Sequence, residues 1–91
     1  MKIVIHKRIK ERHPDISDDE ILEALDKTIN WTQRQKHRGE VFGIGITSKG
    51  RFIEYTYIEH EGKILVYHAQ DATLNGFKEL GLTDRRRYEN R

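Results

Sequence analysis

The second half of the chain carries the side chains that could do chemistry. Arg51 and His68 lie in segments that alternate apolar and polar residues, and a terminal block holds Arg87 and Tyr88. Histidine transfers protons near neutral pH, and arginine stabilises negative charge that develops on a phosphate. Tyrosine can orient a substrate. These residue types suit RNA cleavage without a metal, in which a base takes the proton of a 2′-hydroxyl and an acid protonates the leaving oxygen.

Each of these residue types also has an ordinary structural explanation. Tyrosine is a good strand former, so Tyr55 and Tyr57 can simply pack in a sheet. His68 shares a predicted strand face with Ile64 and Val66, where histidine is more often structural than catalytic. A titratable group outside a demonstrated cleft is weak evidence for catalysis. Two hypotheses therefore stay open: an enzyme that cleaves RNA, and a non-catalytic module that binds RNA or an acidic protein.

No pattern of metal ligands or phosphate-binding loop accompanies these residues. The chain has no cysteine, and its five histidines do not have the spacing of a helical metal site. Residues 43–45 lack the third glycine of a nucleotide-binding loop, and no Gly-x-Ser-x-Gly elbow occurs. We therefore expect neither a metal nor a cofactor.

Charge is unevenly distributed, although the formal net charge is only +2. Acidic residues dominate 15–26, whereas 2–12, 34–38 and 85–91 are rich in lysine and arginine. Separated basic blocks can form a surface for phosphate, or they can be ordinary solvated surface. On the first interpretation, RNA is bound by Arg34, Lys36, Arg38, Tyr55, Arg85 and Arg86.

Hydrophobic periodicity predicts an α+β domain with one strongly marked helix. Ser17 and Glu20 have the spacing of a capping box, and Ile16 and Ile21 can form a hydrophobic staple, so a helix is predicted over 18–29. The acidic residues of this segment suit the positive end of the helix dipole. The inner face of the helix is predicted to hold Ile21, Leu22, Leu25 and Ile29.

Period-two alternation in the rest of the chain predicts an antiparallel meander of three to four strands. The strands are expected over residues 31–38, 42–47, 51–59 and 63–69. The connections at 48–50 and 61–62 are short, and short turns join strands that are neighbours in the sheet.

N-terminal and C-terminal helices are expected to pack on this sheet. A short strand at 3–5 and a helical segment at 7–12 precede the main helix, and helices at 71–80 and 84–90 follow the meander. The length fits one domain over residues 1–91.

The apolar runs are too short for a membrane span, and the first residues lack the apolar core of a signal peptide. The absence of cysteine fits a reducing compartment. We therefore expect a cytoplasmic protein with no membrane partner.

Four segments, in this order along the chain, resemble motifs of the BrnT-like toxins of bacterial toxin–antitoxin pairs. Residues 12–21 resemble the family's Lys/Arg-His-Gly segment before an acidic helix start, and 50–55 resemble its Gly-Arg turn into a central strand. Residues 67–73 resemble its Ile-Ser-Ala-Arg-x-Ala-Thr segment, and 85–89 resemble its closing basic helix that ends in Tyr-Glu. Together these segments span most of the chain.

The resemblance implies a RelE-like fold and a metal-independent endoribonuclease toxin, a hydrolase that works through 2′-hydroxyl attack. It also implies neutralisation by a cognate antitoxin of ribbon-helix-helix type, so DNA would be contacted only through the antitoxin. Arg51 carries over as a catalytic residue, and Arg86, Arg87 and Tyr88 carry over as a second group. His68 is added as the acid or base.

The chain departs from the family pattern at three places. Gln70 stands where the family has arginine, Pro14 replaces a glycine, and residues 74–82 separate the Ala-Thr motif from the final basic helix. Loss of a charged phosphate ligand at position 70 would weaken cleavage. This departure keeps the binding-module hypothesis open.

Overall fold

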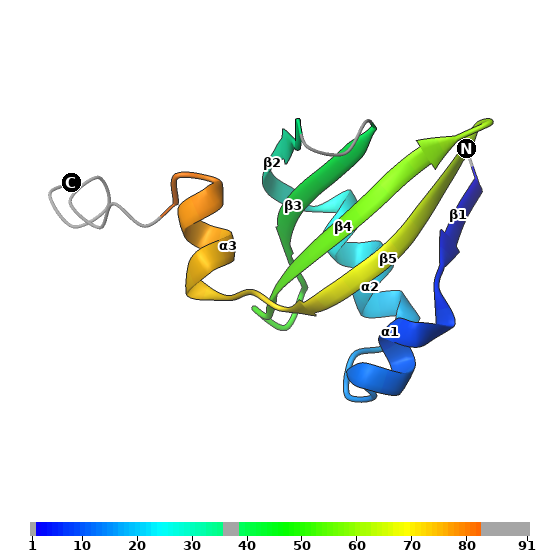
Figure 1. The fold of residues 1–91 in the computed structure, drawn as a ribbon. Coiled ribbons are helices and arrows are strands. Elements are labelled where there is room, and N and C mark those ends of the chain that lie inside the picture. Colours follow the sequence, from blue (N-terminus) through cyan, green and yellow to red (C-terminus); the bar gives the residue numbers. More distant parts are fainter. Residues whose placement is uncertain (1, 36–38, 83–91) are drawn as a thin grey trace, which may run out of the picture.

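The computed structural model describes residues 2–35 and 39–82. It contains a five-stranded sheet with helices on both faces (Figure 1). The α+β class predicted from the sequence is confirmed. The elements are β1 (Lys2–Ile5), α1 (Lys7–Arg12), α2 (Asp18–Asp26), β2 (Thr28–Gln33), β3 (Glu40–Ile46), β4 (Phe52–His60), β5 (Lys63–Asp71) and α3 (Leu74–Glu79).

The sheet is mixed, with the strand order β1-β5-β4-β3-β2. Strands β2 to β5 form the predicted antiparallel meander, but β1 adds a fifth strand that runs parallel to β5, with Ile3 opposite Ile64. The prediction of a purely antiparallel sheet of three to four strands is therefore wrong. Local alternation could not reveal this pairing, because it joins the two most distant strands of the chain.

Helix α2 begins as predicted and ends earlier than predicted. The backbone N–H of Glu20 donates to Ser17 Oγ at 3.1 Å, and the N–H of Ser17 donates to Glu20 Oε1 at 3.1 Å, which completes the capping box. The helix stops at Asp26 rather than at residue 29. Thr28 already belongs to β2, and its Oγ1 donates to the Ala24 carbonyl at 3.1 Å. From Thr28 onward, backbone pairing of β2 with β3 takes the place of the last predicted helical turn.

The predicted inner face of α2 is partly wrong. Ile21 and Ala24 are buried, whereas Leu22 is 39% exposed and Ile29, now in β2, is 47% exposed. The contact with β3 explains this rotation, because a Cβ at Gly45 would overlap the Ala24 carbonyl oxygen. The helix therefore lies directly on the strand backbone along its Ile21–Ala24 side.

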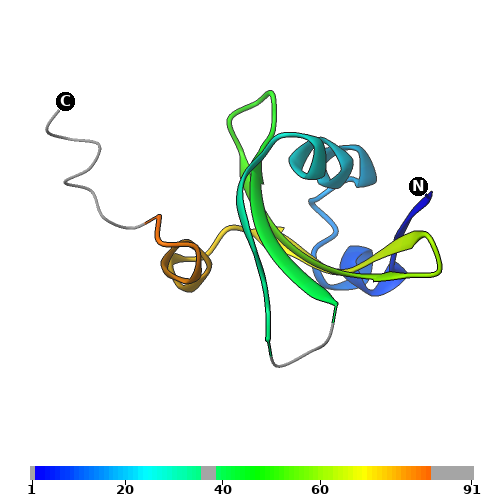
Figure 2. The ribbon, with the colours of Figure 1, turned by 90° about the horizontal axis from the view of Figure 1, so that it is seen from above.

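The two faces of the sheet carry separate apolar clusters. Helices α1 and α2 cover one face, here called the α2 face, and α3 lies on the opposite face, the α3 face (Figure 2). The α2 face buries Ile9, Ile16, Ile21, Ala24, Ile53, Tyr55, Val66 and Ala69. The α3 face buries Phe42 and Ile44 against Leu80, with Phe77 packed beside them.

A bulge in β5 changes the direction of the residues that follow it. Thr56 of β4 lies opposite His68, but Tyr57 lies opposite Val66, so Tyr67 is an extra residue in β5. An extra residue breaks the alternation of side chains along a strand. Val66 faces the α2 cluster, whereas the His68 side chain contacts Glu54 on the α3 face. The prediction that Val66 and His68 share a face is therefore wrong.

Several predicted features lie outside the described residues. They are the helix at 84–90 and the residues Lys36, Arg38, Arg85, Arg86, Arg87 and Tyr88. Within 2–35 and 39–82, every helix is too short or too polar to cross a membrane.

Candidate functional site

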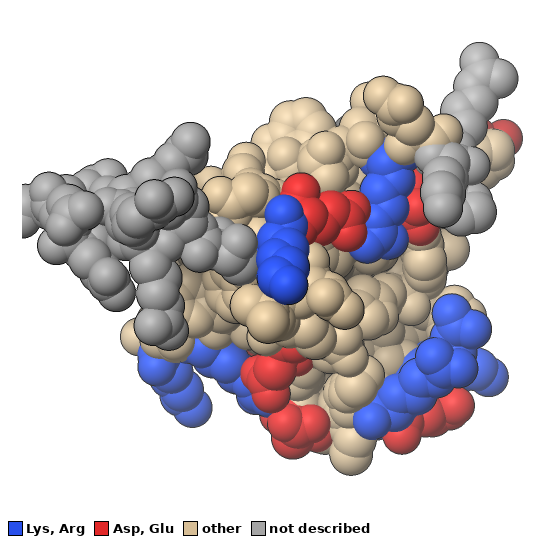
Figure 3. Space-filling view, turned by 60° about the vertical axis from the view of Figure 1, so that its left-hand side comes forward, with Lys and Arg blue, Asp and Glu red and all other residues tan. Residues whose placement is uncertain are grey.

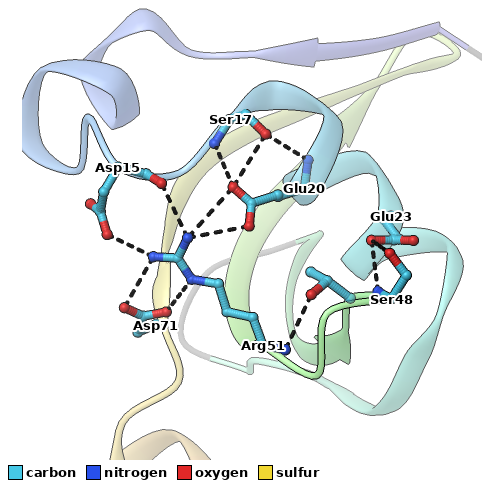
Figure 4. Close-up of polar contacts among 8 residues, drawn as sticks. Asp15, Ser17, Glu20, Glu23, Ser48, Arg51 and Asp71 are labelled. Carbon is cyan, nitrogen blue, oxygen red and sulfur yellow. Dashed lines mark hydrogen bonds and ion pairs between the residues drawn. The ribbon is translucent and has the colours of Figure 1, made fainter.

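Arg51 is held by carboxylates from three different segments (Figure 4). Its Nε donates to Asp71 Oδ1 at 2.6 Å, its Nη2 to Asp15 Oδ2 at 2.6 Å, and its Nη1 to Glu20 Oε2 at 3.2 Å. Asp15 precedes α2, Glu20 lies in its first turn, and Asp71 ends β5. The guanidinium thus ties the start of α2 to the end of the last hairpin.

The charges of this group favour a structural role for Arg51. Hydrogen bonding to Asp71 is the main cause that raises the pKa of Arg51, and Asp15 and Glu20 add to it. The same bond lowers the pKa of Asp71, and the pKa of Glu20 is lowered first by the backbone N–H of Ser17. One positive charge faces three negative ones, so a phosphate would have to displace carboxylates to reach Arg51.

His68 is paired with a buried glutamate. Its Nε2 lies 2.9 Å from Oε2 of Glu54, whose side chain is 6% exposed, whereas the imidazole is 36% exposed. Glu54 also accepts hydrogen bonds from Thr73 N at 2.9 Å, Thr73 Oγ1 at 2.8 Å and Gln70 Nε2 at 3.1 Å. A carboxylate with four donors around it is fixed in place, and it fixes the imidazole in turn.

The pKa of Glu54 determines which nitrogen of His68 carries a proton. Burial opposes ionisation, but the hydrogen bonds from His68, Thr73 and Gln70 outweigh it and hold the pKa of Glu54 at about 2. An ionised carboxylate only accepts hydrogen bonds, so Nε2 of His68 must donate. In a neutral imidazole the other nitrogen, Nδ1, is then a base.

A small polar cleft lies between α1 and β5, beside His68. Strand β1 pairs only with the first part of β5, and after Ile5 the chain turns into α1. Helix α1 therefore flanks the second part of β5. The cleft, of about 110 Å³, is lined by Arg8, Arg12 and His13 from the α1 segment and by Tyr67, His68 and Gln70 from β5.

The arginines of this cleft differ from Arg51 in their surroundings. Arg8 and Arg12 are exposed, and among the described residues neither takes part in a salt bridge. Two guanidinium groups and two imidazoles thus line one small cleft. Arg8, Arg12 and His13 were missed as site residues from the sequence, although Arg12 and His13 open the first of the four resembling segments.

Tyr67 and Arg34 both contact the buried Glu40 on the α3 face. The Tyr67 hydroxyl donates to Glu40 Oε1, and Glu40 is 4% exposed. Arg34 lies 3.8 Å from Glu40, donates to Glu79 at 2.8 and 2.9 Å, and stacks 4.4 Å from the centre of the Phe42 ring. Arg34, which the sequence predicts to bind RNA, thus contacts two glutamates of its own chain.

Tyr55 was predicted on the RNA-binding surface, and the structure places it in the core. The ring is 3% exposed and packs over Gly43, where a Cβ would overlap it. Its hydroxyl lies 2.5 Å from Thr28 Oγ1, and burial raises its pKa. The ring is therefore not accessible to a base in this structure.

Of the predicted catalytic residues, the structure describes Arg51 and His68, and it does not bring these two together. Arg51 contacts Asp15 and Glu20 on the α2 face, whereas His68 contacts Glu54 on the α3 face. Glu54 was missed from the sequence, where the only signal is an acidic residue between the apolar Ile53 and Tyr55 of a strand. On the face drawn in Figure 3, the visible basic side chains form separate groups, with acidic side chains beside several of them.

Within the described residues, no group of three or more His, Asp or Glu side chains is arranged to hold a metal ion. No protein-family model, curated protein or solved structure matches the chain.

Proposed function

We propose that the protein is a metal-independent endoribonuclease with a RelE-like fold, acting at the cleft between α1 and β5. The observation that carries the proposal is the presence of His68, His13, Arg8 and Arg12 in that one cleft. We further propose that a cognate antitoxin, of ribbon-helix-helix type, neutralises it. The likeness of residues 12–21 and 67–73 to BrnT-like segments supports the proposal, because both segments contribute to the cleft.

RNA suits this cleft because it brings its own nucleophile. His68, oriented by Glu54, takes the proton of a 2′-hydroxyl, and the oxygen attacks the adjacent phosphorus. The bond from phosphorus to the 5′-oxygen breaks, and His13 in its protonated form gives the proton to that oxygen. Arg8 and Arg12 stabilise the charge of the phosphorane. The products are a 2′,3′-cyclic phosphate and a free 5′-hydroxyl.

The test is cleavage of single-stranded RNA by the purified protein in the presence of EDTA. His68→Ala should lower the rate about a hundredfold or more, because a positioned proton-transfer group contributes that much. His60 is the matched control, since its side chain is 79% exposed at the tip of the β4–β5 hairpin and His60→Ala should keep full activity. Thermal unfolding of each variant separates lost chemistry from lost folding.

The arginines of α1 offer a second test with controls in the same helix. Arg8→Ala and Arg12→Ala should each lower the cleavage rate about a hundredfold, as loss of a preorganised charge donor does. Lys7→Ala and Lys10→Ala remove equal charge from positions that do not line the cleft, and they should lower the rate far less. Equal effects of all four would mean that only the overall charge of α1 matters.

A non-catalytic module that binds RNA or an acidic protein is the second candidate. Gln70 favours it, because it lines the cleft at the position where the BrnT-like segment has arginine. Gln70→Arg would place a guanidinium beside His68 and should raise cleavage. If the folded wild type and the folded Gln70→Arg variant both leave RNA intact, the enzyme hypothesis is wrong and the binding module replaces it.

A further inference from the structure

An open apolar groove lies on the α2 face of the sheet, beside α2. We propose that this groove is a docking site for a cationic amphipathic helix of a partner protein. The groove is on the opposite side of the sheet from Glu54, and the inference does not depend on the proposed ribonuclease activity.

The groove has a volume of about 440 Å³, and its lining residues come from α2 and from four of the five strands. Its walls are formed by Leu22 and Leu25 of α2, Ile3 of β1, Trp31 of β2, Tyr57 of β4 and Ile64 of β5. Helix α2 turns its Ile21–Ala24 side to the sheet, so Leu22 lies beside that contact, lines the groove and is partly exposed.

Trp31 is the most unusual residue of the groove. It is 60% exposed, and Ile3 and Leu22 are each about 40% exposed. Contiguous apolar surface of this kind marks a contact site for another molecule. Tryptophan in particular is enriched among the residues that contribute most to binding between proteins.

The charge around the groove selects a cationic partner. Asp26 is the single charged residue among the described residues that line it. Asp18, Leu22 and Asp26 are spaced four residues apart, so they form one row along the exposed side of α2. Burial is the main cause that raises the pKa of Tyr57, and the nearby carboxylate of Glu59 adds to it. A bound segment therefore meets a carboxylate, and no lysine or arginine, among the described residues that line its apolar contact.

The edge strand β2 favours a helix over an added β-strand as the occupant. The backbone N–H of Trp31 donates to the side-chain oxygen of Asn30 at 3.0 Å, so this donor of the edge is already used. The amide nitrogen of Asn30 donates to the Leu80 carbonyl at 3.0 Å, which holds that side chain in place. A helix needs no main-chain hydrogen bonds from the groove, only apolar contacts at every third or fourth residue.

The test uses the full chain and two synthetic peptides without tryptophan. One is a leucine/lysine amphipathic helix, and the other is its leucine/glutamate counterpart of the same length. Trp31 is the only tryptophan of the chain, so its fluorescence reports on the groove directly. The lysine peptide should shift the emission saturably to the blue, with an affinity that weakens as salt rises. The glutamate peptide should not bind.

Variants then locate the binding. Asp26→Lys should weaken binding of the lysine peptide at least about tenfold, because it juxtaposes like charges. Trp31→Ala should weaken binding of the lysine peptide about thirtyfold. Calorimetry measures this affinity, because the variant has no tryptophan. Leu74→Ala is the matched control, since Leu74 is 64% exposed on α3, on the other face of the sheet, and the affinity should not change.

Three outcomes would overturn the proposal. If the folded protein does not bind the lysine peptide, the groove is not such a docking site. Equal binding of both peptides, or no effect of Asp26→Lys, would remove the selection by charge. An emission shift that depends on protein concentration alone, and that Leu22→Glu abolishes, would identify a second copy of the chain as the occupant. RNA cleavage is measured in a separate assay, so the two proposals fail independently.

Discussion

Arg51 joins three carboxylates that come from separate parts of the chain, and its removal should affect stability first. Hydrogen bonds to charged groups contribute more than neutral ones, although partial exposure reduces their effect. We expect Arg51→Ala to lower the free energy of unfolding by about 2 kcal/mol. Urea denaturation measures this, and Lys49→Ala, at an exposed lysine of the preceding turn, should leave stability unchanged.

The same variant tests whether Arg51 is a catalytic residue, as the resemblance to BrnT-like toxins implies. Without the guanidinium, Asp71 and Glu20 lose a hydrogen bond that lowers their pKa values, and both values should rise. NMR titration of the carboxyl groups records that change. If Arg51→Ala abolishes RNA cleavage while stability and carboxyl pKa values stay as in the wild type, Arg51 is catalytic and the structural interpretation fails.

Glu54 should make stability depend on pH in the acid range. Its pKa is about 2 in the folded protein, against an ordinary value of 4.5. The folded state therefore binds fewer protons, so the stabilisation is present above about pH 4.5 and is lost as the pH falls toward 2. A difference of this size corresponds to about 3 kcal/mol.

Glu54→Gln tests this pH dependence. The variant should be less stable at neutral pH and should show a flatter fall of stability between about pH 5 and 2. Some slope will remain, because the pKa values of Asp71 and Glu20 are also lowered. Glu59→Gln, at an exposed position of the same strand, should keep the wild-type slope. An unchanged slope in Glu54→Gln would contradict the pairing with His68.

At the scale of the element, the orientation of α2 buries one of two adjacent apolar residues and leaves the other partly exposed. Ile21 is 1% exposed and Leu22 is 39% exposed, although both are apolar and adjacent. Ile21→Ala should lower the free energy of unfolding by about 2–5 kcal/mol, because it leaves a cavity in the core. Leu22→Ala should cost less than about 1 kcal/mol. Equal losses would mean that α2 does not turn Ile21 toward the sheet and Leu22 away from it.

The contact between α2 and β3 depends on Gly45. Alanine is normally better than glycine in a strand, but a Cβ at this position would overlap the Ala24 carbonyl oxygen. The helix would have to move away from the sheet, so Gly45→Ala should lower the free energy of unfolding by about 3 kcal/mol. Chemical denaturation measures the loss, and a neutral or stabilising effect would rule out the close packing.

At the scale of the whole molecule, the distribution of charge matters more than the net charge. If the basic blocks of the sequence act together, affinity for single-stranded RNA should fall steeply between about 50 and 200 mM salt, because bound phosphates release counterions. Replacing Arg85, Arg86 and Arg87 together with alanine should flatten the dependence on salt. Filter binding across a salt series measures both slopes, and an affinity that does not change with salt would count against RNA as the ligand.

Some features of this protein follow from the sequence alone because they depend on residues close together in the chain. The capping box of Ser17 and Glu20 closes within one helical turn, and the start of α2 was predicted from it. The turn at Glu61 and Gly62, where both residues have positive φ, joins β4 and β5 at the predicted place. Alternation along β3 and β4 likewise predicted strands, because side chains alternate between the faces of any sheet, and the short turns predicted that neighbouring strands run antiparallel.

Other features depend on contacts between distant residues, and the tertiary structure decided them. Pairing of Thr28 with Gly45 ends α2 before residue 29, and the parallel pairing of β1 with β5 places α1 beside His68. The bulge at Tyr67 turns His68 toward Glu54. No local pattern predicts these pairings, because their free energy depends on which segments meet after the whole chain has folded. The sequence therefore identified His68 as a candidate, and only the fold supplied its neighbours.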